Sequence, residues 1–375
     1  MEDNRRHRML ILCPYPLGVA AGQRLKFEQY YDDWREAGWE VVPSPFMDDA
    51  LWRVAFERGH LGAKAIGVFK GLLRRVRDLA RIRRFDLVYC FMYVTPFGTT
   101  FFERLARAFA RRLVFDLEDN VVSSTGRITA DHPNRILRFL RGGGKYRYLI
   151  RCADHVITSS PALNRICIEQ NVKRACTYIS SSLDANRFIP SGRHPNDDVV
   201  TIGWTGTFSS VPYLELLRPV FQELARERRF RLRVIGNFDY DLPGVDLEVV
   251  RWTAEREVED LQAIDIGVYP LPDNEWVGGK SGLKAITYMM MGLPCVATDV
   301  GTAPLIVRHG ENGLLARSRE EWLDALRRLI DRPDLRSRLG EQARRDAVAK
   351  YSTAAISVQY RTVLDSVMED SGDRR

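Results

Sequence analysis

The sequence has no long apolar segment and no arrangement of cysteines that would indicate disulfides or a metal centre. Its uncharged run from residue 87 to residue 102 contains Pro96 and Gly98, and it is shorter than the roughly 20 apolar residues of a membrane-spanning helix. The six cysteines lack paired or metal-ligand spacing, which is typical of buried thiols in a reducing compartment. An apolar leader is also missing before residue 9. These absences predict a cytoplasmic protein with no metal and no membrane-spanning segment.

Basic charge, by contrast, is plentiful. Lysine and arginine number 56 against 49 acidic residues, which gives a formal net charge of +7 and a pI near 9.1. This balance suits acidic partners: a nucleotide-sugar, a phosphorylated lipid, an anionic membrane or a nucleic acid. A nucleic acid is disfavoured, because no recognition motif accompanies the charge.

Much of this charge falls in a helical pattern from residue 60 to residue 84, where basic residues alternate with apolar ones. Such a helix could lie on anionic lipid, which would place the protein peripherally on the inner face of the membrane. It could equally pack its apolar side on its own sheet and expose a basic face to water. The pattern alone leaves both interpretations open.

A length of 375 residues is enough for two domains, each with its own core. Apolar runs that alternate with helical patterns predict an α/β fold throughout. We expect the first domain at residues 1–185 and the second at residues 199–350, joined by a stretch that lacks periodicity and is rich in proline and glycine.

The stretch from residue 265 to residue 301 predicts a strand, a glycine-rich loop, a helix and a second strand. Its two short apolar runs suit buried parallel strands. Between them Ser281 is a candidate helix cap, and the helix would end at Gly292. This geometry places the helix N-terminus at the carboxyl edge of the sheet, where backbone N–H groups bind anions. The residues predicted to face such a ligand are Gly279, Ser281, Gly282 and Leu283.

Lys280 and Lys284 flank the predicted N-terminus, and their spacing of four places them on one helix face. Cations at this end oppose the helix dipole, at a cost of roughly 0.3–1 kcal/mol each. An anionic ligand between them would remove the conflict. The alternative is two solvated lysines that tolerate a small penalty.

The segment from Tyr288 to Ala297, Tyr-Met-Met-Met-Gly-Leu-Pro-Cys-Val-Ala, resembles the donor-site segment of the retaining glycosyltransferase family 4. That family carries two glutamates before this ending, separated by seven intervening residues. Here they would fall on Gly279 and Thr287, so both are replaced. The pattern Gly-Lys-x-x-x-Lys-x-x-x-Tyr-Met that stands there resembles a branch acting on surface polysaccharides.

The resemblance implies the GT-B fold, with two Rossmann-like domains facing a cleft and the nucleotide-sugar on the second. The last helix, residues 353–368, would cross back to the first, acceptor-binding domain. It also implies that the loop after the first strand faces the donor phosphates, which makes Gly22, Gln23 and Arg24 candidates. Two glycines in a strand-to-helix turn are by themselves a weak signal.

Three carboxylates, Asp116, Glu118 and Asp119, follow one another at the end of a predicted strand. Active sites of α/β domains lie at such ends, so these residues could bind an acceptor hydroxyl or act as acid and base. They could instead be ion-pair partners of the many basic residues. Related polysaccharide enzymes often show acidic residues at this place.

The second domain opens with a strand that turns into Thr205, Gly206 and Thr207. Many family members place an arginine and a lysine in this turn for the diphosphate, and neither is present here. Lys280 and Lys284 would then provide the charge, and Thr287 would take the ribose position. Asp239-Tyr-Asp241 mimics a metal motif, but its proline and glycine neighbours indicate a solvated turn.

These inferences predict a hexosyl- or related glycosyltransferase that needs no cofactor beyond its donor. It would move a sugar from a nucleotide-sugar to a hydroxyl of a glycan or polyprenyl-linked acceptor, in cell-surface polysaccharide or lipid-linked glycan synthesis. Two alternatives stay open. One is a catalytically lapsed nucleotide- or sugar-binding partner of a glycan assembly complex, and the other is a nucleotide-sugar epimerase of the same fold.

Overall fold

The computed structural model describes residues 6–55, 57–118, 144–190, 199–274 and 277–369. The chain divides into two compact units. The first holds Met1–Ser180, Gly279–Ser281 and Ser357–Arg375, and the second holds Ser181–Gly278 and Gly282–Ile356.

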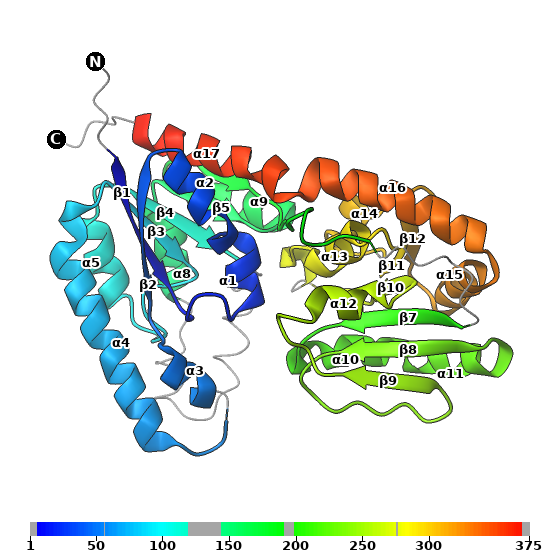
Figure 1. Ribbon diagram of the computed structural model, residues 1–375. Helices are drawn as coiled ribbons and strands as arrows, with labels where there is room; N and C mark the ends of the chain where they lie inside the picture. Colours follow the sequence, from blue (N-terminus) through cyan, green and yellow to red (C-terminus); the bar gives the residue numbers. More distant parts are fainter. Residues whose placement is uncertain (1–5, 56, 119–143, 191–198, 275–276, 370–375) are drawn as a thin grey trace. The chain divides into compact units, whose positions relative to one another are not determined.

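The first unit is built on a parallel sheet with the strand order β2-β1-β3-β4-β5-β6 (Figure 1). Its strands are β1 (His7–Cys13), β2 (Trp39–Pro45), β3 (Leu87–Phe91), β4 (Leu113–Leu117), β5 (His155–Thr158) and β6 (Cys176–Tyr178). The helices between them are α1 (Ala21–Lys26), η1 (Glu28–Tyr30), α2 (Tyr31–Glu36), α3 (Asp49–Ala55), α4 (Leu61–Arg81), η2 (Ile82–Arg84), α5 (Phe101–Phe109), α8 (Gly144–Cys152) and α9 (Pro161–Gln170).

The second unit contains a parallel sheet of the same kind, with the order β12-β11-β10-β7-β8-β9. Its strands are β7 (Val200–Thr205), β8 (Phe230–Ile235), β9 (Asp246–Val250), β10 (Ile266–Tyr269), β11 (Cys295–Thr298) and β12 (Gly313–Ala316). The remaining helices of the chain are η3 (Phe208–Ser210), α10 (Val211–Leu214), η4 (Glu215–Leu217), α11 (Arg218–Glu227), α12 (Glu257–Gln262), η5 (Val277–Gly279), α13 (Leu283–Met290), α14 (Ala303–Ile306), α15 (Arg319–Asp331), α16 (Pro333–Tyr351) and α17 (Thr353–Glu369).

Both sheets are covered on their two faces, which explains why their strands are continuous apolar runs in the sequence. Four of the five residues from Met9 to Cys13 in β1 are fully buried, and so are Ile266 and Val268 in β10. The prediction of two Rossmann-like α/β domains is therefore confirmed at the level of each unit.

Glycines within β7 and β10 allow side chains to lie directly on the strands. A Cβ added to Gly267 would lie 2.2 Å from the ring of Tyr288, and one added to Gly203 would lie 2.3 Å from Ile264. Glycine inside a strand often marks such a close approach. At Gly267 it lets the tyrosine of α13 lie flat against the sheet, with its hydroxyl at the end of the neighbouring strand.

The predicted last helix is present as α17, and from Ser357 onward it groups with the first unit. Arg361 forms an ion pair of 2.6 Å with Asp33 of α2, and the ring of Tyr360 lies 4.9 Å from that of Tyr30. No helix in the described part of the chain is both long and apolar enough to cross a membrane.

Candidate functional site

The sheet of the second unit reverses its strand order between β7 and β10, since β8 and β9 extend on one side and β11 and β12 on the other. Ligands of open parallel sheets bind at the carboxyl ends of the strands at such a switch point. Two segments meet there: the turn after β7 and the start of α13. Both had been singled out from the sequence.

Helix α13 begins later than predicted. Its first residue is Leu283, and its N-cap is Gly282, which has a φ of 76° and makes no side-chain capping bond. A Cβ at Gly282 would lie 2.2 Å from the Ile306 side chain, so both backbone conformation and packing require glycine there. The prediction that Ser281 caps the helix is therefore wrong.

The later start also separates the two lysines. Lys280 precedes the helix, so it does not share a helical face with Lys284, and that prediction is wrong as well. Lys280 and its neighbours Gly279 and Ser281 group with the first unit, whereas Lys284 belongs to the second. Within the second unit the cation at the switch point is Lys284.

The Lys284 side chain reaches from α13 to the turn after β7. Its Nζ donates a hydrogen bond of 3.2 Å to Ser210 Oγ and lies 4.2 Å from the centre of the Trp204 ring. A Cβ on Gly206 would be only 2.7 Å from this Nζ. Cation–π contact and hydrogen bond together hold the ammonium over Gly206, so the structure brings these two predicted residues together.

The turn itself is held by backbone hydrogen bonds. Thr205 N donates to Tyr288 Oη at 3.0 Å, and Gly206 N donates to the Ile235 carbonyl at 3.0 Å. Thr207 is the N-cap of η3 and forms a capping box with Ser210. Burial raises the pKa of Tyr288, so its hydroxyl stays protonated and accepts the Thr205 N–H through an oxygen lone pair.

Thr287 lies one helical turn after Leu283 and is 8% exposed. Its hydroxyl donates to the Leu283 carbonyl at 2.8 Å. The hydroxyl proton is thereby used, and only the oxygen lone pairs remain to accept a bond from a ligand. The assignment of Thr287 to a ribose stays a prediction.

In the first unit, Gly22 of α1 lies against Glu118, which follows β4. A Cβ on Gly22 would lie 2.2 Å from Glu118 Oε2, so a larger residue would displace the Glu118 carboxylate from this position. The structure thus brings these two predicted residues together at the carboxyl edge of the first sheet. Asp119 lies outside the described residues.

Gln23, predicted to bind substrate, instead holds the preceding loop. Its side chain is 1% exposed. Its Nε2 donates to the Tyr15 carbonyl at 2.9 Å and to Glu28 Oε1 at 2.5 Å, while its Oε1 accepts from Tyr15 N. Glu28 in turn accepts from Gly18 N, and its pKa is raised by burial although Gln23, Gly18 and Arg24 oppose the shift. Both the oxygen and the nitrogen of the Gln23 amide are therefore engaged in hydrogen bonds within the protein. The predicted role of Gln23 in substrate binding is corrected to a structural one.

Asp116 is likewise part of the core. Its side chain is fully buried; Oδ1 lies 2.5 Å from Lys26 Nζ, and Oδ2 accepts the hydroxyl proton of Tyr89. Burial raises the pKa of Asp116, and Lys26 and Tyr89 oppose that shift. A carboxylate enclosed in this way cannot reach an acceptor. The ion-pair alternative is correct for Asp116, whereas the side chain of Glu118 is only partly buried.

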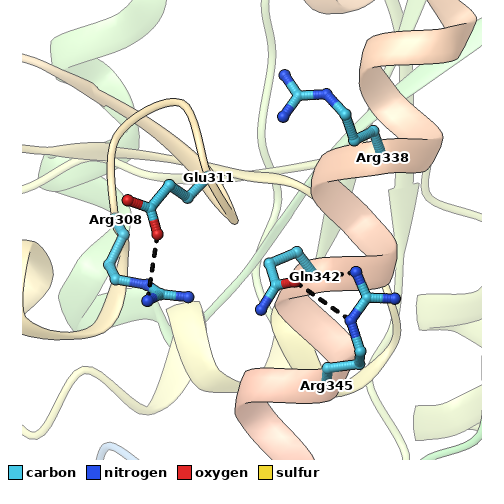
Figure 2. Close-up of a pocket in the computed structure, with 5 residues that line it drawn as sticks. All are labelled: Arg308, Glu311, Arg338, Gln342 and Arg345. Atoms are coloured by element: carbon cyan, nitrogen blue, oxygen red, sulfur yellow. Dashed lines mark hydrogen bonds and ion pairs between the residues drawn. The ribbon is translucent and has the colours of Figure 1, made fainter.

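Pockets of the second unit differ in their distance from the candidate site. One of about 540 Å³ opens at the carboxyl ends of β10, β11 and β12, next to the switch point, and is lined among others by Asp273, Asp299 and Trp322. The other, of about 420 Å³, lies between the loop before β12 and α16 (Figure 2). That loop is at the amino end of β12, so the second pocket is remote from the candidate site. Its Arg308 also has carboxylate partners, Glu311 and Asp346.

The predicted absence of a metal at Asp239 is not tested directly, but the side chain has another partner. Asp239 forms an ion pair with Arg251, and the Asp241 carbonyl accepts from Arg218 at 2.8 Å. Among the residues that the structure describes, no three potential ligand side chains gather as a metal site.

Residues 199–332 match the model of a family described as Glycosyl transferases group 1. A D-inositol 3-phosphate glycosyltransferase of Corynebacterium aurimucosum is 34% identical over 131 residues, which cover 33% of this chain and 30% of that protein. N-acetyl-alpha-D-glucosaminyl L-malate synthase of Bacillus anthracis is 30% identical over 91 residues, or 24% of each chain. The matched segments therefore span less than a third of these relatives' length.

Solved structures resemble nearly the whole chain. Sucrose-phosphate synthase from Thermosynechococcus elongatus superimposes with a TM-score of 0.68 at 17% identity, over 98% of this chain and 100% of that one. HepE of Anabaena, solved in complex with UDP, superimposes with a TM-score of 0.65 at 17% identity, over 96% of this chain and 100% of that one. At this identity the likeness establishes the fold, and it confirms the predicted GT-B class. The family match supports the resemblance seen from Tyr288 to Ala297, but it does not test the lysine-containing pattern.

Proposed function

We propose, from the match of residues 199–332 to the Glycosyl transferases group 1 family, that this protein is a glycosyltransferase. It takes a hexosyl or related group from a nucleotide-sugar and transfers it to a hydroxyl of a glycan or polyprenyl-linked acceptor. The observation that carries the proposal is the position of Lys284, whose ammonium is held over Gly206 at the switch point of the second sheet.

The donor diphosphate would lie between Lys284, the first turn of α13 and the Thr205–Thr207 turn. Backbone N–H groups at a helix start and a nearby ammonium are the groups that bind phosphate oxygens. As the bond from sugar to phosphate breaks, negative charge collects on the leaving diphosphate, and these fixed groups stabilise it more than they stabilise the intact donor. No nucleophile is needed for this part of the mechanism.

Glycines support this arrangement. Gly206 and Gly236 let this turn pack closely, since a Cβ on Gly206 would lie 2.3 Å from Trp204 and one on Gly236 would lie 2.4 Å from the Gly206 carbonyl. The absence of a side chain at Gly206 allows the Lys284 ammonium to lie over the backbone of the turn. HepE of Anabaena, which shares the fold, was solved with UDP and with UDP-glucose, so uridine diphosphate sugars are the first donors to test.

For the acceptor we propose Glu118, which lies against Gly22, as the group that accepts the proton of the attacking hydroxyl. Its neighbour Asp116 is enclosed in the core, so we do not propose it for that role. Retention of configuration is part of the proposal only through the resemblance to family 4. A polyprenyl-linked acceptor would place the protein on the cytoplasmic face of a membrane.

A lapsed binding partner is the second candidate, favoured by the replacement of both family glutamates by Gly279 and Thr287. Such a protein would bind a nucleotide-sugar without breaking it. An epimerase would convert the donor with no acceptor present.

The first experiment screens nucleotide-sugars by thermal shift. A ligand at 100 times its dissociation constant adds about 2.7 kcal/mol to the free energy of unfolding. Release of nucleoside diphosphate, with and without acceptors, together with the configuration of the sugar that remains on the nucleotide, then separates the three functions. We expect acceptor-dependent release by the wild type, a large loss in Lys284→Met, and no change in the exposed control Lys350→Met. Binding without any release would favour the lapsed partner.

A further inference from the structure

Helix α4 turns apolar side chains toward water. Ile66, Phe69, Leu73 and Val76 are each between 53% and 60% exposed, and their spacing places them in one row along the helix. We call these four residues the α4 stripe. The alternative in which the apolar side of this helix packs on its own sheet therefore does not hold for the stripe, although Ile82 beyond it is buried.

The inward face of α4 explains this orientation. Gly67 and Gly71 lie so close to α3 and β2 that a Cβ would be 2.7 Å from Leu51 and 2.8 Å from Phe46. The buried Arg75 lies farther along the same face, and its guanidinium donates to the carbonyls of Cys13, Ser44 and Val94. Rotating the helix to bury the stripe would break these three bonds and push side chains into the glycine contacts. The stripe is thus fixed outward.

Positive charge accompanies the stripe. Residues 61–84 contain eight basic residues and one acidic residue, a formal +7 that equals the net charge of the whole chain. Lys70 and Arg77 each follow a stripe residue by four positions, so they lie directly beside it. Within the described ranges, these two exposed side chains have no carboxylate partner.

Helix α5 lies beside α4 (Figure 1) and also exposes apolar side chains. It too buries a charged residue, Glu103, while Phe101 is 60% and Phe109 36% exposed. The guanidinium of Arg83 lies 5.1 Å from the centre of the Phe109 ring, which joins η2, directly after α4, to α5.

We propose that the α4 stripe docks on an anionic lipid bilayer, with α4 lying in the plane of the interface. An apolar row beside unpaired cations is the pattern of helices that insert one face among lipid headgroups. A second copy of this chain fits less well, because two segments of charge +7 would face each other. The inference does not rest on sugar transfer, since docking requires no donor.

The test is cosedimentation of the full chain with vesicles of phosphatidylcholine alone or mixed with phosphatidylglycerol. We expect binding to the anionic vesicles, and its loss when salt near 1 M shortens the screening length to about 3 Å. Lys70→Gln/Arg77→Gln should weaken binding by about tenfold or more, given the worth of each cation near such a surface. Phe69→Ser/Leu73→Ser should weaken it comparably, because the apolar insertion is lost.

Matched controls use exposed residues on other elements. Val172→Ser/Val358→Ser removes equally exposed apolar side chains, and Arg226→Gln/Lys350→Gln removes exposed cations; both should bind vesicles like the wild type. All variants change exposed positions, so each should keep the melting temperature of the wild type. Equal binding to neutral and anionic vesicles, or unchanged binding of the stripe variant, would overturn the proposal. A dimer in solution that the stripe variant dissociates would overturn it as well, in favour of self-association.

Discussion

Replacing Lys284 by methionine removes the ammonium but keeps an unbranched apolar side chain over Trp204. In the folded protein this lysine makes a cation–π contact and a hydrogen bond to Ser210. Loss of the cation–π contact costs about 0.5–1 kcal/mol and loss of the hydrogen bond costs about 0.5–1.5 kcal/mol, while removal of a cation from a helix N-terminus returns roughly 0.3–1 kcal/mol. These terms partly offset one another, so we expect the free energy of unfolding to fall by about 2 kcal/mol or less.

Turnover should respond very differently. If Lys284 stabilises the leaving diphosphate, its loss should lower kcat by about 10²–10³-fold, the scale for removing one preorganised charge-stabilising donor. Donor affinity should fall less, because the charge on the diphosphate grows as the bond breaks. Melting temperature and transfer rate are measured on one preparation, with Lys350→Met as the matched control. A marked fall in melting temperature would make Lys284 structural, and full activity would remove it from the site.

Three further substitutions test individual assignments. Thr287→Ala should weaken nucleoside diphosphate binding by roughly 0.5–1.5 kcal/mol, the net worth of one hydrogen bond; an unchanged affinity in calorimetric titration would separate Thr287 from the ribose. Asp116→Asn should lower the free energy of unfolding in urea by about 3–5 kcal/mol, because it leaves Lys26 buried without its partner; a stable but inactive variant would return Asp116 to the acceptor site. Burial lowers the pKa of His155 to about 4, so the unfolded chain binds the extra proton first and stability should fall as pH drops from 6.5 toward 4, by up to about 3 kcal/mol. His155→Gln should flatten that part of the stability–pH curve. An equally steep curve in this variant would show that His155 does not cause the loss of stability.

Much of the fold could be read from the sequence because buried parallel strands leave continuous apolar runs. The apolar run predicted as a strand after Asp265 is β10, from Ile266 to Tyr269. The strand from Cys295 to Thr298 matches β11. These elements depend on burial of both sheet faces, which the sequence records directly.

The site was only partly predictable. The turn after β7 and Lys284 were found, because strand ends and helix starts can be located from patterns. The later start of α13 was missed, since it depends on the positive φ of Gly282 and its packing on Ile306. The role of Tyr288 was also missed, although Gly267 inside a buried strand is a signal of close approach.

The errors about Asp116 and about α4 have one common cause: both depend on contacts between residues far apart in the sequence. The partner of Asp116 is Lys26, ninety residues earlier in the chain, and nothing local in the sequence joins them. In α4 the helical spacing was recognised, but not which face points inward. That choice depends on the contacts of Gly67 and Gly71 and on the bonds of Arg75 to β1, β2 and the loop after β3.

The most direct test of the central claim is hydrogen exchange of the backbone amides with and without a uridine diphosphate sugar. If the donor diphosphate lies at the switch point of the second sheet, protection should appear in residues 205–210 and 283–287. The arginine-lined pocket between residues 308 and 345 (Figure 2) should show no change. Protection confined to that pocket, with none at the turn or the start of α13, would contradict the account.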